Sequence, residues 1–292
     1  MKKKCIWICI LFPLVLLLLC LFLFPINGNL YLNMNSDNGL NSYMYNLNNN
    51  RSNKIVINGY EDVIDYYPLS DGYVAIGVNY VPTQDRLTDG FEGEYCLVIH
   101  KKSHEFSYSM NSSASIMCVY DNKAYFALYG DDDAVANFYT CSLSDFKIEK
   151  LPTSVVYVAS DSHTFAYVKS VRNYEQVVLD LDGSENVIFL AKEIQRIDIL
   201  QNKLLITYDE GQKEKCVMYN LSTGELTNHK KVSDSLEYAA TLNGHDWYIH
   251  KYEIIHNDYG TPLWNVVVMR SGVRVKFLIF SPTSLGSPYL LQ

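Results

Sequence analysis

A polar turn followed by a β-rich run recurs along this chain at intervals of about forty residues. Each unit contains such a turn, a β-rich run, a loop, a second β-rich run and another polar turn. The first turns of the units lie at Asn27-Gly28, Asp71-Gly72, Asp121-Asn122, Asp161-Ser162, Gln201-Asn202 and Asn243-Gly244. This period is typical of repeats built from four β-strands and differs from that of helical repeats.

The clearest unit spans residues 154–191, where β-branched and aromatic residues form the runs VVYVASD, TFAYVKS, EQVVLDL and ENVIFLA. Such runs between polar turns predict four antiparallel strands. The first unit has only three runs, at 29–35, 41–47 and 53–58, and a short run at 289–292 can supply its missing strand. We therefore expect an all-β, six-bladed β-propeller over residues 27–292, with seven blades as the alternative.

The segments DNKAYFALY, QNKLLITY and LSTGEL carry a family resemblance. The repeat that contains them resembles the six-bladed propellers of the TolB-like and related domain-of-unknown-function type in bacterial envelope proteins. The resemblance covers nearly the whole region after residue 26 and implies the propeller fold. It implies little about function, because propellers serve as binders, scaffolds and enzymes.

Residues 1–26 form a separate segment in which Lys2, Lys3 and Lys4 precede an uncharged apolar run from Cys5 to Phe24. A helix of about twenty residues spans the hydrocarbon core of a bilayer. We expect an uncleaved transmembrane anchor, with a cleaved signal peptide and a secreted domain as the alternative. The lysines predict a cytoplasmic N-terminus, which leaves the propeller outside the cell membrane.

The exported region is acidic. Residues 1–26 hold three lysines and no acid, so the rest of the chain carries 21 basic and 32 acidic side chains, a net charge of −11. Such a surface does not suit nucleic acid, whose phosphates require positive charge. Solubility explains the charge, and a cationic partner is the functional interpretation.

The connections between the second and third strands of the units vary in length and composition, unlike the short turns. Variable loops on a rigid frame are where binding residues gather. Strand alternation places all these loops on one face of the ring, where we expect an unknown protein or small ligand to bind. The candidate residues there are Asp85, Asp89, Glu92, Asp131, Asp132, Asp133, Asp209, Glu210, His256 and Asp258.

The acidic loop residues and the nearby histidines raise three chemical possibilities, namely Ca²⁺ binding, zinc binding and catalysis. Clustered carboxylates suit Ca²⁺, but three consecutive aspartates do not match an EF-hand loop, so a solvated acidic turn without a cofactor is favoured and Ca²⁺ binding is the alternative. The three histidines His245, His250 and His256 spread along one expected strand and do not converge as zinc ligands. The sequence contains no nucleophile elbow, HExxH motif or P-loop, and no catalytic residue is predicted.

Two further expectations concern single residue pairs. Cys96 and Cys118 could form a disulfide between neighbouring blades, or both could be free thiols in β-strands. Trp247 and Trp264 lie on adjacent expected strands, where cross-strand packing is favoured over a carbohydrate-binding platform.

These patterns predict a membrane-anchored binding or scaffold module that uses its variable loop face. A hydrolase or lyase that uses loop carboxylates is the second hypothesis, and a structural role in an envelope assembly is the third. Gly28 leads directly into a run that corresponds to the second strand of the other units. The anchor should therefore hold toward the membrane the face of the ring that carries the short turns. The variable loops then point away from it.

Overall fold

The computed structural model describes most of the chain after residue 28, as β-strands and short connections. The described residues are 29–36, 39–46, 51–82, 91–130, 136–160, 164–181, 184–200, 203–211, 213–229, 236–242, 245–256, 262–270, 273–280, 284–285 and 289–291. In this described part there is no helix that is long and apolar enough to cross a membrane. The expected anchor, Cys5 to Phe24, lies outside the described residues.

The described strands form six antiparallel sheets, which we number in chain order. The first contains β1 (Asn29–Ser36), β2 (Gly39–Asn46), β3 (Arg51–Lys54), β24 (Ser284–Leu285) and β25 (Tyr289–Leu291). The second contains β4 (Asp62–Leu69), β5 (Gly72–Pro82), β6 (Phe91–Lys101) and β7 (His104–Met110). The third contains β8 (Ala114–Tyr120), β9 (Lys123–Tyr129), β10 (Ala136–Ser142) and β11 (Ile148–Lys150).

The remaining sheets repeat the same order of four consecutive strands. The fourth contains β12 (Val155–Ser160), β13 (Phe165–Val171), β14 (Tyr174–Leu181) and β15 (Ser184–Ala191). The fifth contains β16 (Glu193–Leu200), β17 (Lys203–Glu210), β18 (Lys213–Asn220) and β19 (Leu226–His229). The sixth contains β20 (Leu236–Leu242), β21 (His245–His256), β22 (Pro262–Arg270) and β23 (Val273–Phe280). The prediction of an all-β repeat of four-stranded sheets is confirmed.

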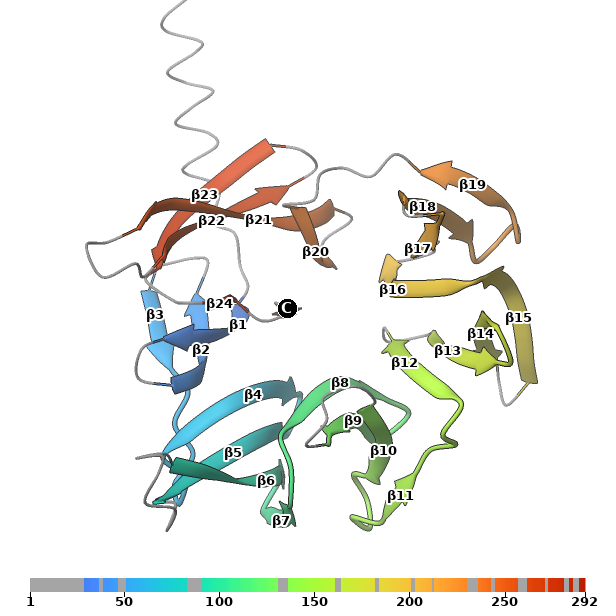
Figure 1. Ribbon diagram of the computed structural model, residues 1–292. Helices are drawn as coiled ribbons and strands as arrows, with labels where there is room; N and C mark the ends of the chain where they lie inside the picture. Colours follow the sequence, from blue (N-terminus) through green and yellow to red (C-terminus); the bar gives the residue numbers. More distant parts are fainter. Residues whose placement is uncertain are drawn as a thin grey trace, which may run out of the picture.

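The sheets stand around a common centre, with the first strand of the second to sixth sheets innermost (Figure 1). The inner position of the first sheet is filled from the C-terminal end of the chain. In β25, Leu290 lies opposite Leu30 of β1, and in β24, Leu285 lies opposite Met34 of the same strand. The expected pairing of the C-terminal segment with the first unit is therefore present, with a second short strand that the sequence did not indicate.

The core consists of layers between neighbouring sheets. Alternate residues of a strand point to opposite faces, so a sheet between two neighbours can bury both of its faces, as the second sheet does. In the second sheet, Val74 and Ile76 pack toward Ile116 and Phe126 of the third sheet. Ala75 between them belongs to a different cluster, with Ile57 and Val98, on the side of the first sheet. Full burial of each large apolar side chain stabilises the fold by about 1.5–3 kcal/mol.

Five of the inner strands share a local irregularity near their start. The pairing with the second strand of the sheet skips one residue, as expected for a β-bulge, which bends a strand and increases its twist. The skipped residues are Ile64, Met117, Val156, Gln195 and Ala239. Each bulge redirects the side chains that follow it at the inner edge of the sheet.

The structure tests the two residue pairs that the sequence suggested, one of cysteines and one of tryptophans. Cys96 and Cys118 are free thiols, as are Cys141 and Cys216, so the disulfide alternative is wrong in this structure. Trp247 lies opposite Arg270, whereas Trp264 lies opposite Glu253. The two tryptophans are thus near opposite ends of the β21–β22 pair and are not cross-strand partners.

Candidate partner-binding face

One end of the ring carries every connection between a second and a third strand, and we call it the loop face. Topology requires this, because each inner strand starts at that end and the strands alternate in direction. Among the predicted residues, Asp209 and Glu210 end β17 on this face. Glu92 lies in β6 opposite Val81, and His256 ends β21 opposite Pro262. The others lie outside the described residues, namely Asp85, Asp89, Asp131, Asp132, Asp133 and Asp258.

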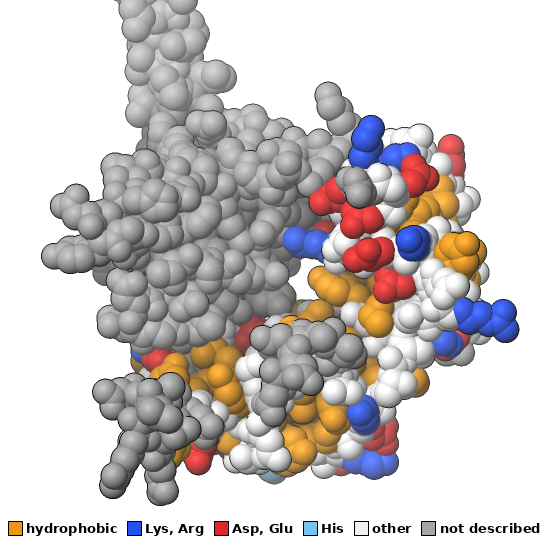
Figure 2. All heavy atoms as spheres, viewed as in Figure 1, with side chains coloured by type: hydrophobic (Ala, Val, Ile, Leu, Met, Phe, Trp, Pro, Cys, Tyr) orange, Lys and Arg blue, Asp and Glu red, His pale blue; other side chains and the backbone are white. Residues whose placement is uncertain are grey.

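Three carboxylates form a row across the fifth sheet at the loop face. Asp209 of β17 lies directly opposite Glu193 of β16 and also directly opposite Glu214 of β18. Like charges directly opposite each other in a sheet are destabilising. Figure 2 shows acidic side chains gathered over this part of the molecule. We call Glu193, Asp209 and Glu214 the acidic row.

Neighbouring side chains hold the acidic row in place. The amide nitrogen of Gln195 donates to Glu193 Oε1 at 3.1 Å and to Asp209 Oδ2 at 2.9 Å. Beside the row, Lys215 forms an ion pair with Glu210, and this hydrogen bond and charge raise the pKa of the Lys215 amine. Gln195 is the bulge residue of β16, so the bulge places its amide between two carboxylates. The sequence predicted Asp209 but missed Glu193 and Glu214, since both lie outside the expected connection between the second and third strands, from which the candidates were taken.

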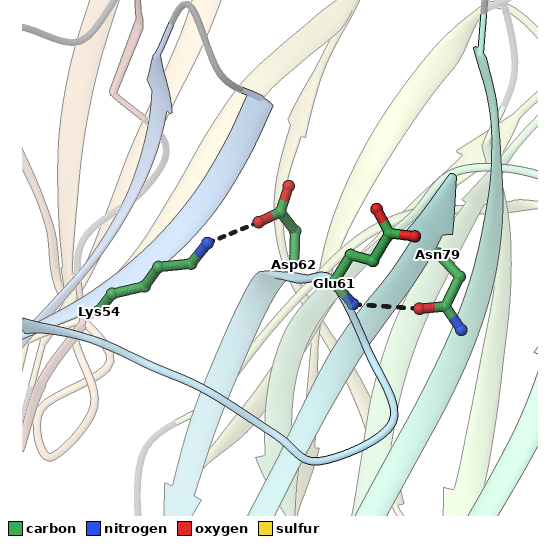
Figure 3. A network of polar contacts seen from close by, with 4 residues as sticks. All are labelled: Lys54, Glu61, Asp62 and Asn79. Atoms are coloured by element: carbon green, nitrogen blue, oxygen red, sulfur yellow. Dashed lines mark hydrogen bonds and ion pairs between the residues drawn. The ribbon is translucent and has the colours of Figure 1, made fainter. Parts of the chain in front are cut away.

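Other carboxylates near the loop face connect one sheet to the next. Lys54 Nζ of β3 lies 2.7 Å from Asp62 Oδ1 of β4, and the Asp62 side chain is only 9% exposed. Next to this pair, Asn79 Oδ1 accepts a hydrogen bond of 3.0 Å from the backbone N–H of Glu61 (Figure 3). Burial, with a smaller contribution from the Asp62 charge, raises the pKa of Tyr80 to about 12. This group joins the first two sheets.

Asp65 makes the equivalent connection between the second and third sheets. Its Oδ2 accepts a hydrogen bond of 2.6 Å from the backbone N–H of Ile116, and the Ser115 hydroxyl lies 3.3 Å from the same oxygen. Its Oδ1 accepts a bond of 2.9 Å from the backbone N–H of Tyr66. The whole residue is only 3% exposed. A buried carboxylate with several donors has a structural role as an acceptor.

Glu175 connects the fourth and fifth sheets in the same way. Its Oε2 accepts a hydrogen bond of 2.5 Å from the backbone N–H of Ile194 at the start of β16. Two kinds of acid therefore share this face. Asp62, Asp65 and Glu175 hold neighbouring sheets together, whereas the acidic row lies at the surface of a single sheet.

The inner strands of the fourth and fifth sheets add a tyrosine and an ion pair. Arg196 Nη2 lies 2.8 Å from Asp198 Oδ1, and both residues are on β16. Burial, with a smaller contribution from the Asp198 charge, raises the pKa of Tyr157 on β12 to about 12. No sequence motif marked these residues, because they occupy ordinary positions in strand patterns.

The structure describes some of the residues considered as metal ligands but not the three consecutive aspartates. Within the described ranges, no three His, Cys, Asp or Glu side chains converge in a way that could hold a metal ion. His245, His250 and His256 all lie on β21, as expected. Ca²⁺ binding by Asp131, Asp132 and Asp133 stays a prediction, since these residues lie outside the described part.

Comparison with known proteins identifies the fold. No protein-family profile and no curated protein matches the sequence. TolB from Acinetobacter baumannii superposes with a TM-score of 0.58 at 10% identity, over 90% of this chain and 66% of that chain. A chain of a nidogen/laminin complex gives 0.52 at 8% identity, over 90% and 98% of the two chains.

An acylaminoacyl peptidase in complex with Z-Gly-Gly-Phe-chloromethyl ketone gives a TM-score of 0.50 at 13% identity. The match covers 84% of this chain and 44% of the peptidase chain. The chain thus spans just under two thirds of TolB and less than half of the peptidase. At these identities the similarity concerns the fold alone. The described repeat of four-stranded sheets, together with the likeness to TolB, shows that the described residues adopt a β-propeller fold similar to that of TolB.

Proposed function

We propose that this protein is a membrane-anchored, extracytoplasmic binding module whose loop face takes a cationic partner. The acidic row carries the proposal. Three carboxylates placed directly opposite one another in a sheet repel each other and cost stability, and Glu193 and Glu214 are exposed at the surface. A row of like charges on one rim attracts positively charged ligands and accelerates their association.

The proposed orientation rests on the start of the chain. Lys2 to Lys4 and the apolar run from Cys5 to Phe24 have the composition of a membrane anchor. β1 begins at Asn29 on the end of the ring opposite the loop face, because it occupies the second position of its sheet. An anchor that leads into β1 would leave the loop face pointing away from the bilayer.

A closed ring of six blades is part of the proposal. Six sheets are present among the described strands, and β24 and β25 fill the inner position of the first sheet. This pairing removes an unpaired inner edge between the first and last sheets. A closed ring gives the acidic row a rigid support, which reduces the cost of ordering when a partner binds.

The test uses the full-length chain in its native membrane, with a photo-crosslinking amino acid in place of Lys213, which is exposed beside the acidic row. A matched probe replaces Ser144, exposed in the β10–β11 turn at the opposite end of the ring. We expect a discrete crosslinked partner from position 213 and none from position 144. Crosslinking from position 213 should weaken as ionic strength rises, because salt screens surface charge.

Two sets of substitutions then distinguish a specific role of the acidic row in partner binding from an effect of the overall negative charge. The triple variant Glu193→Gln, Asp209→Asn, Glu214→Gln should abolish the crosslink. The control variant Asp145→Asn, Glu149→Gln removes acids near the opposite end of the ring and should leave it unchanged. Equal crosslinking from both positions, or a crosslink that survives the triple variant, would contradict the proposal.

A further inference from the structure

The fourth sheet carries a strip of exposed apolar side chains near the outside of the ring. Tyr174 and Leu190 are 60% and 59% exposed, Val187 is 47% exposed and Val171 is 36% exposed. Single exposed apolar residues are ordinary on protein surfaces, whereas contiguous ones mark interaction sites. We call these four residues the apolar strip.

The strand register places the members of the apolar strip on one face of the sheet. Val171 lies opposite Tyr174, and Leu190 lies opposite Gln176. Val187 lies opposite Val178, which shares a face with Tyr174 and Gln176 because side chains alternate along a strand. A bulge at Ile188 makes this possible, since it brings Val187 and Leu190 to the same side although they are three positions apart.

β15 is a long outer strand. It has 8 residues, as does β23, and β7 has 7, whereas β3, β11 and β19 have 3 or 4. Figure 1 shows it along the outer margin of the ring, and no described strand pairs with its outer edge. Natural proteins shorten or charge such edges to prevent association. The central run Val187-Ile188-Phe189-Leu190 has no charged residue.

Opposite charges lie at the two ends of this strand. Glu185 is exposed near the start of β15, on the same face as Val187, and Lys169 Nζ lies 3.4 Å from its Oε2. Lys192 directly follows β15, and Arg172 lies in the β13–β14 turn beside Tyr174; both are exposed. Glu185 and its partner Lys169 therefore lie at one end of the strip, Lys192 and Arg172 lie at the other, and the apolar residues lie between them.

We propose that this strip is a homodimer interface, whose occupant is a second copy of the chain related by a two-fold axis beside β15. In such an isologous contact the same patch meets itself in reverse order. Antiparallel alignment places Glu185 of each copy against the partner's Lys192 and Val187 against the partner's Leu190. Burial of apolar side chains drives the association, and the complementary ends fix its direction.

The experiment measures the mass of the full-length chain in a mild detergent by sedimentation over a range of protein concentrations. The native chain should reach the mass of a dimer. Leu190→Glu should raise the dimer dissociation constant at least tenfold, because it places a charge in the apolar middle. The matched control Leu226→Glu changes a residue that is 42% exposed on the outer strand β19, and should leave the dissociation constant unchanged.

A charge exchange tests the two-fold arrangement independently of the apolar change. Glu185→Lys should weaken the dimer, since two basic ends then meet, and the double variant Glu185→Lys, Lys192→Glu should restore it. Glu185 pairs with Lys169 and also accepts a hydrogen bond from the Tyr167 hydroxyl, so circular dichroism confirms that each variant is folded before its mass is measured. A native chain that stays monomeric at every concentration overturns the proposal. So does an equal effect of Leu190→Glu and Leu226→Glu, or a double variant no stronger than Glu185→Lys.

Discussion

Asp65 on the inner strand of the second sheet accepts a hydrogen bond of 2.6 Å from the backbone N–H of Ile116 on the inner strand of the third. Glu175 accepts from Ile194 in the same manner two sheets further on. Both donor residues directly precede the bulge of their strand. A bulge disrupts the regular ladder locally, so a carboxylate from the preceding sheet satisfies an N–H group at the inner edge. The inner bulges and the contacts between sheets therefore depend on each other.

The first prediction concerns Asp65→Asn. An amide has only one oxygen acceptor, whereas Asp65 accepts from two backbone N–H groups with two different oxygens. One of these N–H groups would face an amide NH₂ group in a buried position. We expect the free energy of unfolding to fall by about 2 kcal/mol, measured as a shift in the urea midpoint.

Asp121→Asn is the matched control for this change. Asp121 is exposed in the turn between β8 and β9 and has a φ of 44°, a conformation that Asn adopts readily. The free energy of unfolding of this variant should stay within about 0.5 kcal/mol of that of the native chain, as is usual for surface positions. If both variants shift the midpoint equally, Asp65 has no special role between the sheets.

The second prediction is that removal of residues 284–292 destabilises the fold. These residues contain β24 and β25, which pair with β1, and their loss would expose the inner edge of the first sheet. The thermal midpoint should fall by several degrees in a melting experiment. Leu290→Pro should lower the midpoint as well, because proline cannot donate to a strand ladder. An unchanged midpoint in the truncated chain would refute closure by the C-terminal strands.

The repeat and most strands could be predicted from the sequence, because polar turns and β-rich runs are local signals. The run 203–209 corresponds to β17, and the run 123–129 corresponds to β9 without any change. The connections between second and third strands also occur where the sequence placed them. Local patterns were sufficient at these positions, since the turn residues and the runs agree with the fold.

Features that depend on register or on contacts between sheets could not be predicted. The run 53–58 was expected as one strand, but β3 ends at Lys54 and Ile57 turns into the core beside the second sheet. Trp247 and Trp264 lie on neighbouring strands as expected, yet the long β21–β22 pair places them far apart along the strands. Asp65 lies in an apolar run with no motif, and only the bulge of the next sheet explains it.

The third prediction is loss of stability in alkali. Burial is the main cause that raises the pKa of Tyr125 and of Tyr157 from 10.0 to about 12. Between these values the unfolded chain loses phenol protons that the folded chain keeps, so the unfolded state binds fewer protons. The free energy of unfolding should therefore be unaffected below pH 9 and fall between pH 10 and 12, by about 1.4 kcal/mol per pH unit for each such tyrosine.

Urea titrations at a series of pH values measure this slope. Tyr157→Phe should make the decline between pH 10 and 12 shallower by about one proton. Tyr108→Phe serves as the control, because its ring lies on the surface and is 42% exposed. A profile in which the two variants decline in parallel would show that burial of Tyr157 does not govern its ionisation.

The fourth prediction is that the acidic row is retained at a cost to stability. In Asp209→Asn the central charge between Glu193 and Glu214 is removed, while an amide oxygen still accepts from Gln195. Relief of two like-charge contacts should raise the free energy of unfolding by about 0.5 kcal/mol at low salt. The gain should shrink at 1 M salt, because screening weakens the repulsion in the native chain.

Asp145→Asn is the control for Asp209→Asn, because it removes a carboxylate whose neighbours stabilise its charge. Hydrogen bonds from Ser142 and from the Lys147 backbone lower the pKa of the Asp145 carboxyl, so this exposed charge is stabilised where it lies. Its neutralisation should leave stability unchanged or lower it slightly. If Asp209→Asn lowers the free energy of unfolding and Asp145→Asn leaves it unchanged, the acidic row contributes to folding stability. If instead Asp209→Asn raises the free energy of unfolding and Asp145→Asn does not, Asp209 is retained for something other than folding, as a binding surface for a cationic partner requires.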